Sequence, residues 1–266
     1  MNIKVLLTGS DGNCCLISYK DTNILIDGGF KTKTKMEEIL EPILTKHKID
    51  AIIITHEHTD HLNMWTGRLS MIYNIPIFLH KKHIENEASR KQKYFSFENK
   101  KEGKGYNAIL EFIEPDIDFQ IKDITIHPFT VYHDAKKTLG FRFNNNELTY
   151  VSDCGFLSNK IKKELLISDN IALEFNYNTE KLINSPRNYE NKIRSLSKFG
   201  HLNNEEAIDF LKFAKIKFNK EFKNVITLHT SKTHNNKEII EKLFKDLNLN
   251  TKLYFMEREN NESINI

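Results

Sequence analysis

Cysteine is scarce in this sequence: the 266 residues include three, Cys14, Cys15 and Cys154, and their spacing fits no disulfide framework. Such an odd set is typical of a protein from a reducing compartment, and we expect the three side chains to lie in the core. No apolar run approaches the roughly 18 residues that a membrane span needs. The short apolar run near the N-terminus has no cleavage site after it. These absences predict a cytoplasmic protein, of a bacterial cell or of a phage, with no membrane partner.

An excess of charge of one sign is also lacking. The sequence has 39 Lys and Arg against 36 Asp and Glu, a formal net charge of +3. A charge this small neither identifies nor excludes a nucleic-acid partner. No segment rich in Pro, Gly or Ser divides the chain and no repeat is visible, so residues 1–266 are predicted to form a single domain. The oligomeric state stays open, and a homodimer is compatible with the sequence.

What the sequence does contain is an alternation of apolar strand-like runs and helical patterns, which indicates an α/β fold. The run 50–55 is almost continuously apolar, which is typical of a strand buried on both faces. The segment 90–107 is polar and basic and is predicted to be a mobile loop. Strands are predicted at 3–7, 14–19, 23–29, 50–55, 75–80, 123–133, 139–144, 147–155, 170–176, 222–230 and 252–257, and helices at 33–47, 62–74, 81–91, 203–218 and 235–247.

The segment 55–62, THEHTDHL, directly follows the apolar run and carries most of the chemistry. In its H-x-H-x-D-H pattern, His56 and His58 can point together from an extended turn, and Asp60 and His61 reach a second nearby point. Imidazole and carboxylate groups are ligands for Zn²⁺, Mn²⁺ or Fe ions. A solvated polar loop is the alternative for any one of these residues alone, but the four together at this spacing favour a metal site.

Three further ligand-type residues end apolar runs elsewhere in the chain, which is the placement of the first cluster. We therefore expect them to complete a site for two divalent metal ions, zinc first, with manganese or iron as alternatives. The predicted ligands are His56, His58 and His133 for one ion, Asp60, His61 and His229 for the other, and Asp153 as the bridging carboxylate.

These motifs resemble the metallo-β-lactamase superfamily, which implies a four-layer αββα sandwich with a dinuclear metal site at the sheet edge. The segments GSDGNCCLI, HDAKKTLGF, SDCG, LEFNYN, GHLNNEEA and LHTSKTHNN resemble the YycJ/WalJ-like branch of that superfamily. Three positions depart from its pattern: Asp11 replaces a serine, Tyr177 a histidine and Asn178 an aspartate. Phage anti-Pycsar enzymes, which hydrolyse cyclic mononucleotides, are similar in the same segments and can carry tyrosine there.

The chemistry of such a site points to phosphodiester hydrolysis. Two divalent ions about 3.5–4 Å apart lower the pKa of a bridging water and clamp the oxygens of a phosphodiester. His201 precedes a predicted helix with Asn203 or Asn204 as N-cap, where an imidazole could donate to a phosphate oxygen or protonate the leaving group. A capping-region residue is the alternative. The residues expected to take part in catalysis are Asp60, Glu174 and His201.

Other polar residues are predicted to surround the metal ligands. Glu174 and Asp27 end apolar strands and either orient metal-bound histidines or cap turns. Asp134, beside His133, is either a proton carrier or an outer acid. The remaining candidates for the pocket or its surroundings are Ser10, Asn13 and Tyr177, with Trp65 as pocket wall or core. Residues assigned no site role are Cys154, His47, His80, His83, His127 and His234.

The combined prediction is a dimetal phosphodiesterase that hydrolyses nucleic acid by attack of a metal-bridged hydroxide, similar to the YycJ/WalJ-like nucleases and exonucleases. A cyclic mononucleotide phosphodiesterase is the alternative enzyme, because the small charge and compact chain suit a small substrate. The GHLNN segment and the aromatic residues within 90–107 suit a polymer, although a solvated lid is the alternative for that segment. A metal-binding regulatory protein without turnover and a lactamase or thioesterase are weaker alternatives.

Overall fold

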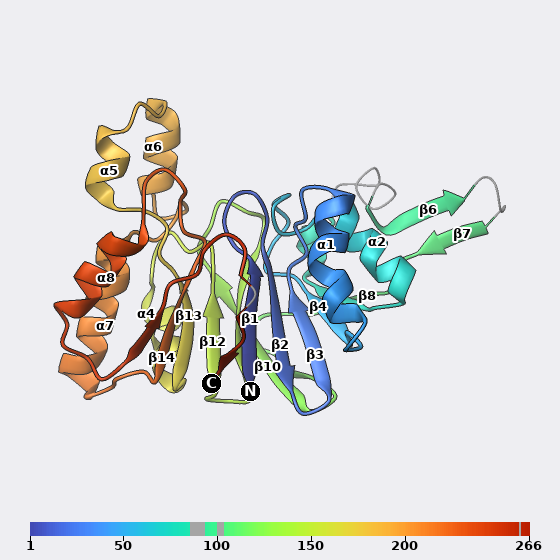
Figure 1. Cartoon of the computed structure of the whole chain (residues 1–266), viewed down its shortest axis with the longest axis horizontal. Coiled ribbons are helices and arrows are strands. Elements are labelled where there is room, and N and C mark those ends of the chain that lie inside the picture. Colours follow the sequence, from blue (N-terminus) through green and yellow to red (C-terminus); the bar gives the residue numbers. More distant parts are fainter. Residues whose placement is uncertain (86–93, 100–103, 261) are drawn as a thin grey trace.

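The computed structural model describes residues 1–85, 94–99, 104–260 and 262–266. Within these residues, two seven-stranded sheets pack against each other and helices cover both outer faces (Figure 1). This arrangement is the predicted α/β sandwich, so the fold prediction is confirmed. The N- and C-termini lie close together at one end of the sheets. No helix in the described part of the chain is long and apolar enough to cross a bilayer.

The first sheet begins with a meander of antiparallel strands and continues with parallel strands. Its order is β16-β1-β2-β3-β4-β5-β8. Parallel neighbours need crossover connections, which α1 (Lys33–Leu44) and α2 (Met64–Tyr73) supply here. The strands are β1 (Asn2–Leu7), β2 (Cys14–Tyr19), β3 (Thr22–Ile26), β4 (Ala51–Ile53), β5 (Ile77–Leu79), β8 (Leu110–Phe112) and β16 (Ile264–Asn265).

The second sheet repeats this plan in the order β15-β14-β13-β12-β11-β10-β9. Strands β9 to β12 are antiparallel neighbours, and β12 to β15 are parallel. The strands are β9 (Phe119–Ile121), β10 (Ile124–Val131), β11 (Thr138–Phe143), β12 (Leu148–Val151), β13 (Asn170–Glu174), β14 (Asn224–Leu228) and β15 (Lys252–Tyr254). The helices of this half are α4 (Asn159–Ile167), α5 (Thr179–Asn184), α6 (Tyr189–Leu196), α7 (Asn204–Phe218) and α8 (Lys237–Lys245).

Three apolar layers hold the sandwich together. Side chains such as Ile24 and Phe141 fill the space between the sheets. Leu211 of α7 packs with Leu173 in the layer between the second sheet and its helices, and Leu40 of α1 belongs to the layer on the outer face of the first sheet. Each such fully buried side chain stabilises the fold by about 1.5–3 kcal/mol, so the sheets form a rigid base for the residues that follow their strands.

The sheet topology brings the ends of distant strands together. β3 and β4 are parallel, and so are β12, β13 and β14. Ligand sites in such sheets lie beyond the carboxyl ends of the strands. Helices α5 and α6 stand above the rest of the second sheet's helices as a projection, hereafter the α5–α6 projection, residues 179–196 (Figure 1).

Two local predictions differ from the structure in their described parts. The predicted helix over 81–91 is a short 3-10 helix, η1 (Lys81–His83), in its described part, because His80 Nδ1 accepts from Lys82 N and holds a tight turn. The predicted loop over 90–107 contains an antiparallel hairpin, β6 (Ser96–Asn99) and β7 (Lys104–Asn107). Pairing across a hairpin is not encoded in the polar composition that favoured a loop. Residues 86–93 and 100–103 of these two predictions lie outside the described residues.

Candidate metal centre

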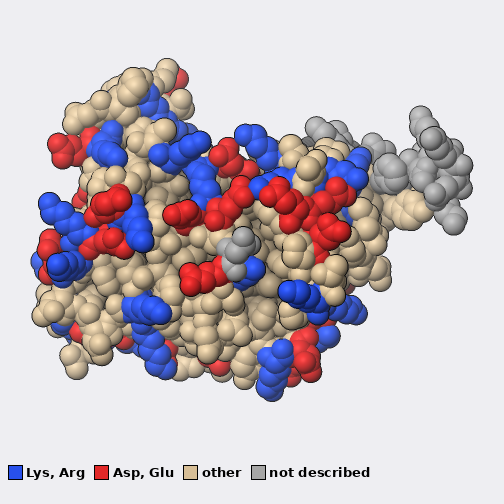
Figure 2. Space-filling view, viewed as in Figure 1, with Lys and Arg blue, Asp and Glu red and all other residues tan. Residues whose placement is uncertain are grey.

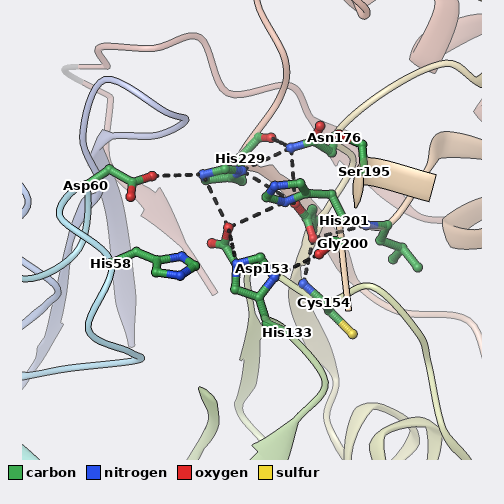
Figure 3. A network of polar contacts seen from close by, with 12 residues as sticks. His58, Asp60, His133, Asp153, Cys154, Asn176, Ser195, Gly200, His201 and His229 are labelled. Atoms are coloured by element: carbon green, nitrogen blue, oxygen red, sulfur yellow. Dashed lines mark hydrogen bonds and ion pairs between the residues drawn. The ribbon is translucent and has the colours of Figure 1, made fainter. Parts of the chain in front are cut away.

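The seven predicted metal ligands come together at the carboxyl ends of the central strands, although they come from four separate segments (Figure 3). Asp153 lies in the middle of the cluster in Figure 3, with labelled histidines around it. The segments are the loop after β4, carrying His56, His58, Asp60 and His61, and the residues that follow β10, β12 and β14, which are His133, Asp153 and His229.

Two of the groups that the candidate ligand atoms form correspond to the two predicted sets. In the first group, the ligand atoms of His56, His58 and His133 lie within 4.8 Å of one another. In the second group, the same limit holds for Asp60, His61 and His229. Each group therefore offers three donors at a separation that one ion could span.

Asp153 connects the two groups. Its Oδ2 lies 3.1 Å from Nε2 of His61, and its Oδ1 lies 3.4 Å from Nε2 of His229 and 3.8 Å from Nε2 of His133. The carboxylate is almost completely buried. A carboxylate between two histidine groups has the position that a bridging ligand requires.

The donor set fits divalent metal ions. Nε2 of His56 is buried and has no hydrogen-bond partner among the described residues. Burial lowers the pKa of His56 well below its usual value and also lowers that of His133, which favours the neutral form that binds metal. Although burial opposes it, nearby carboxylates raise the pKa of His61 and of His229, so these two rings would release a proton when a metal ion binds. Although burial opposes ionisation of Asp60, the neighbouring His61 and His229 lower its pKa. Neutral imidazoles and ionised carboxylates are the ligand forms that Zn²⁺, Mn²⁺ and Fe²⁺ accept.

The other ring nitrogen of each buried ligand histidine is fixed by a partner behind the cluster. Nδ1 of His61 lies 2.8 Å from Oδ2 of Asp27, and Nδ1 of His133 lies 2.8 Å from the carbonyl oxygen of Gly200. Such outer partners set the tautomer and the orientation of a metal-bound imidazole. Asp27 is fully buried behind His61 and is also bonded to Thr55.

Glu174 is a buried hub that connects three parts of the site. Its Oε1 lies 2.8 Å from Nδ1 of His201 and 3.4 Å from Nδ1 of His229. Its Oε2 accepts from the backbone N–H groups of Cys154 and Leu202. Burial raises the pKa of Glu174, but the charge of His201 and the side-chain hydrogen bonds to His201 and His229 more than offset this, and the pKa is lowered. An ionised Glu174 therefore orients His201 from behind and fixes the backbone beside Asp153.

His201 lies at the rim of the cluster. Its ring stacks on His229 with centroids 5.1 Å apart and planes 13° from parallel. Because Glu174 occupies Nδ1, Nε2 is the nitrogen left for a substrate. The N-cap of α7 is the neighbouring Asn203, whose side chain accepts from Glu206 N, so His201 is not the capping residue.

Tyr177 contributes to the site indirectly. Its hydroxyl donates to the carbonyl oxygen of Ser195 at 3.3 Å, and the same carbonyl accepts from the backbone N–H of His201 at 3.2 Å. Burial raises the pKa of Tyr177 to about 12. The tyrosine is therefore a neutral donor that fixes the segment carrying His201.

Asp134 and Arg194 form a charged pair at the open side of the cluster. Asp134 Oδ1 lies 3.2 Å from Nε2 of His133 and 3.8 Å from Nε2 of His58. The guanidinium of Arg194 donates to both oxygens of Asp134. An outer acid beside His133 was predicted from the sequence, but its arginine partner on α6 was not.

A cleft opens beside Asp60, hereafter the proximal cleft, with a volume of about 380 Å³. Trp65 is part of its wall, as are Phe30 and Tyr94, so the tryptophan is a pocket residue rather than only a core residue. The residues lining the proximal cleft are Ser10, Asp11, Gly29, Phe30, Lys31, Thr59, Asp60, Asn63, Met64, Trp65 and Tyr94.

Close backbone packing supports the loop that carries Asp60. Asn13, predicted to line the pocket, is buried, and its backbone N–H donates to the carbonyl of Asp60 at 2.8 Å. Its side-chain nitrogen lies 2.9 Å from Nε2 of His61. A Cβ at Gly29 would lie 1.8 Å from the same carbonyl of Asp60, so only glycine fits there. The chain thus passes close to the site at Gly29.

Sequence reasoning missed Asn176 and Arg194. Nδ2 of Asn176 donates to Glu174 Oε1 at 3.1 Å and lies 3.0 Å from Nδ1 of His229. Asn176 follows Glu174 by two positions at the end of β13, and this placement was a signal for it. Arg194 lies in a helix that the sequence pattern did not reveal, so no signal of that kind existed.

Burial lowers the pKa of His83 to about 3, and its Nε2 bonds the carbonyl of Lys137, in keeping with a core role.

Left-handed backbone occurs at three of these strand ends: Asp27 has φ 60°, Asp153 φ 50° and His229 φ 50°. The left-handed region is unfavourable in free energy for L-residues that have a Cβ. A residue with these backbone angles turns the chain directly after the strand ends. Its side chain then points across the edge of the sheet. Strain of this kind is typical of functional sites.

We expect His229→Gly to be more stable than His229→Ala in the metal-free protein by about 1–2 kcal/mol. Both variants lack the imidazole, so the difference isolates the Cβ at φ 50°. Urea unfolding in the presence of a chelator measures it. Equal free energies of unfolding would mean that the left-handed backbone at this position is not strained.

Comparison with known proteins gives relatives of two kinds. A family model described as the beta-lactamase superfamily domain matches residues 22–219. Exodeoxyribonuclease YycJ of Bacillus anthracis is 27% identical over 247 residues, which cover 90% of this chain and 86% of that protein. Exodeoxyribonuclease WalJ of Streptococcus pneumoniae is 29% identical over 239 residues, covering 88% and 83%. The metallo-beta-lactamase fold protein YhfI of Bacillus subtilis superposes with a TM-score of 0.71 at 15% identity over 99% of each chain, which shows the shared fold.

Proposed function

The chain belongs to the beta-lactamase superfamily domain family and is a metal-dependent hydrolase, and from this premise we propose that it hydrolyses phosphodiester bonds of nucleic acid. The resemblance drawn from its motifs is confirmed at the level of the superfamily and of its YycJ/WalJ-like relatives. The observation that carries the proposal is the pair of Glu174 and His201 beside the metal ligands, 2.8 Å apart. In hydrolysis of a carbonyl compound such as a lactam or thioester, carried out by the metal ions alone, Glu174 and His201 would have no role.

The proposed ligands would hold two divalent ions, which activate a water and neutralise charge on a phosphate when bound. Asp60, ionised and facing the proximal cleft, is in reach to accept a hydrogen bond from the attacking water. Asp27 and the Gly200 carbonyl keep the rings of His61 and His133 in the binding orientation.

His201 would act on the leaving group. With Nδ1–H donated to ionised Glu174, a protonated ring keeps Nε2–H as the proton that it can transfer. Transfer of that proton to the departing oxygen avoids release of an unstabilised alkoxide, and Glu174 stabilises the charged ring before the transfer. Glu174 is in this scheme a positioning residue, because it acts through His201.

Arg194 would contribute to phosphate binding. Its fork-shaped guanidinium pairs with Asp134 at the open side of the ligand cluster. Guanidinium groups bind phosphate oxygens in the same two-point geometry. A phosphate that enters between His58 and Asp134 can therefore share the guanidinium with the aspartate.

DNA is the first substrate to consider, because the relatives that match over most of the chain are named exodeoxyribonucleases. A 3′,5′-cyclic mononucleotide is the second candidate. The proximal cleft favours it, since an aromatic-lined cleft of about 380 Å³ beside Asp60 suits a single nucleotide. The aromatic side chains there could stack on a nucleobase in either case.

A substrate panel tests the proposal. We expect the zinc- or manganese-loaded protein to hydrolyse bis-p-nitrophenyl phosphate and linear DNA, and to lose this activity with a chelator, because the metal ligands activate the water. The panel contains duplex DNA, single-stranded DNA, RNA, 3′,5′-cyclic nucleotides and the lactam nitrocefin. Turnover of nitrocefin without any phosphodiester cleavage would refute the proposal, and cleavage confined to cyclic nucleotides would favour the second candidate.

A further inference from the structure

A second cleft lies next to the proximal cleft and is lined by cations, and we propose that it binds backbone phosphates of a polynucleotide strand whose scissile phosphate lies at the metal ligands. This inference rests on the proposed function and specifies a polymeric substrate. The cleft, hereafter the distal cleft, has a volume of about 720 Å³. Its main lining residues are Arg187, Lys232 and Arg258, with Ser185, Thr233 and His234.

The distal cleft adjoins the metal centre. Ser10 and Asp11, in the turn between β1 and β2, line both clefts, so the two are neighbours across a single turn. The wall that carries Lys232 follows β14 directly, three residues after the proposed ligand His229. A chain held in the distal cleft would therefore continue toward the proposed ligands.

The opposite wall comes from the α5–α6 projection. Arg187 lies in the link between α5 and α6 and donates to Ser195 Oγ on α6. In Figure 2, Lys and Arg atoms gather where this projection meets the body of the molecule, with some acidic atoms beside them. The projection therefore adds positive charge over the carboxyl ends of the strands, where the reaction would occur.

The charge of the distal cleft is positive. Three cations line it against one acid, Asp11, and that acid pairs both with Arg258 at 2.8 Å and with Lys31 at 3.3 Å. Arg187 and Lys232 form no ion pair with an acid of the described residues. Like charges held close together are unfavourable without a counter-anion, so the cleft gains free energy when an anion enters.

The pKa of His234, on the cleft wall, is sensitive to the positive charge around it. Partial burial lowers its pKa, and Arg187, Lys181 and Lys192 lower it further. A neutral imidazole leaves the positive charge of the wall to the lysine and arginine side chains. The hydroxyl groups of Ser185, Ser231 and Thr233 add neutral donors between these cations.

The cations of the distal cleft bear on the choice between the two candidate substrates. A cyclic mononucleotide has one phosphate, which the metal ligands would occupy, and so it has nothing to place in the distal cleft. A strand has a phosphate at every nucleotide, and lysine and arginine side chains bind such phosphates without regard to sequence. The distal cleft therefore favours a polynucleotide.

Binding tests the inference without turnover. We expect Lys232→Gln and Arg187→Gln each to weaken binding of a fluorescent single strand of about eight nucleotides, measured by anisotropy in a chelator. The loss should be roughly tenfold or more per variant, and the slope of log Kd against log salt should fall by ~0.7 for each lost phosphate contact. Lys46→Gln is the control, since Lys46 is exposed and lines neither cleft. Thermal unfolding checks that each variant is folded.

Turnover separates this inference from the proposed function. For the metal-loaded variants, the ratio of kcat/KM on the oligonucleotide to kcat/KM on bis-p-nitrophenyl phosphate should fall roughly tenfold, because only the oligonucleotide reaches the distal cleft. If the wild-type protein cleaves DNA and the variants keep its ratios and Kd values, the proposed role of the distal cleft is wrong and the proposed function stands. A wild-type protein without phosphodiesterase activity would overturn the function, and polyglutamate binding as tightly as the oligonucleotide would overturn the polynucleotide assignment.

Discussion

Replacing Asp153 with alanine is expected to reduce bound metal from about two equivalents to less than one per chain and to abolish measurable phosphodiester hydrolysis. The carboxylate lies 3.1 Å from Nε2 of His61 and 3.4 Å from Nε2 of His229, between the two ligand groups. Loss of an outer partner of a metal site costs ~10–100-fold in affinity or activity, and loss of a bridging ligand should cost more. Elemental analysis after reconstitution and the bis-p-nitrophenyl phosphate assay measure the two effects.

Asp50→Ala is the matched control for this variant. The Asp50 side chain is also buried, with 4% exposure, and accepts from the backbone N–H of Asn23 and pairs with Lys122. It precedes β4, whereas the metal loop follows β4. The control should lose stability but keep its metal content and its rate. If Asp153→Ala retained two equivalents of metal, the proposed arrangement of the ligands would be wrong.

Much of the fold could be predicted because its strands are local and strongly patterned. The apolar run before THEHTDHL fixes β4 as a central strand, and similar runs reveal β12, β13 and β14. The predicted helix 203–218 lies between β13 and β14, which are parallel neighbours, whereas α4, between β12 and β13, was not predicted. The site followed from the same signal: a ligand-type residue after a buried strand lies at the carboxyl edge, and Asp153 and His229 both do.

The rest depended on contacts that no local pattern contains. Arg194 reaches Asp134 across 60 positions in the sequence, from a short helix, α6, whose one buried residue is Ser195. The hairpin of β6 and β7 arises from cross-strand pairing in a polar segment. The distal cleft combines the α5–α6 link, the loop after β14 and Arg258 near the C-terminus, and no one of these segments reads as a binding site by itself.

Glu174 and His201 show how the structure narrows a choice that the sequence left open. The sequence allowed His201 to be only a residue of the capping region before a helix. Asn203, one of the two predicted N-caps, caps α7, and the imidazole of His201 bonds a fully buried glutamate. A buried carboxylate that accepts two backbone N–H groups and an imidazole N–H has a fixed position. His201 therefore has the fixed ring orientation that proton transfer to a substrate requires.

His201→Ala should leave metal content unchanged and lower kcat for an oligonucleotide by roughly 10²–10⁴-fold, as is typical when a general acid or charge-stabilising donor is lost. The imidazole is outside the proposed ligand set, so both metal equivalents should remain. His47→Ala is the control, because His47 is exposed and away from the cluster. Steady-state kinetics and elemental analysis on the same preparations measure rate and metal together.

The leaving group then identifies the role of His201. A p-nitrophenolate leaving group needs no proton, whereas a nucleotide alkoxide does, so a general acid should matter less for bis-p-nitrophenyl phosphate than for an oligonucleotide. Equal losses on both substrates would instead mean that the imidazole only binds the phosphate. Loss of metal or of thermal stability would mean a structural role for the contact with Glu174. Full activity on both substrates would remove His201 from the reaction and, with it, the observation on which the phosphodiesterase proposal rests.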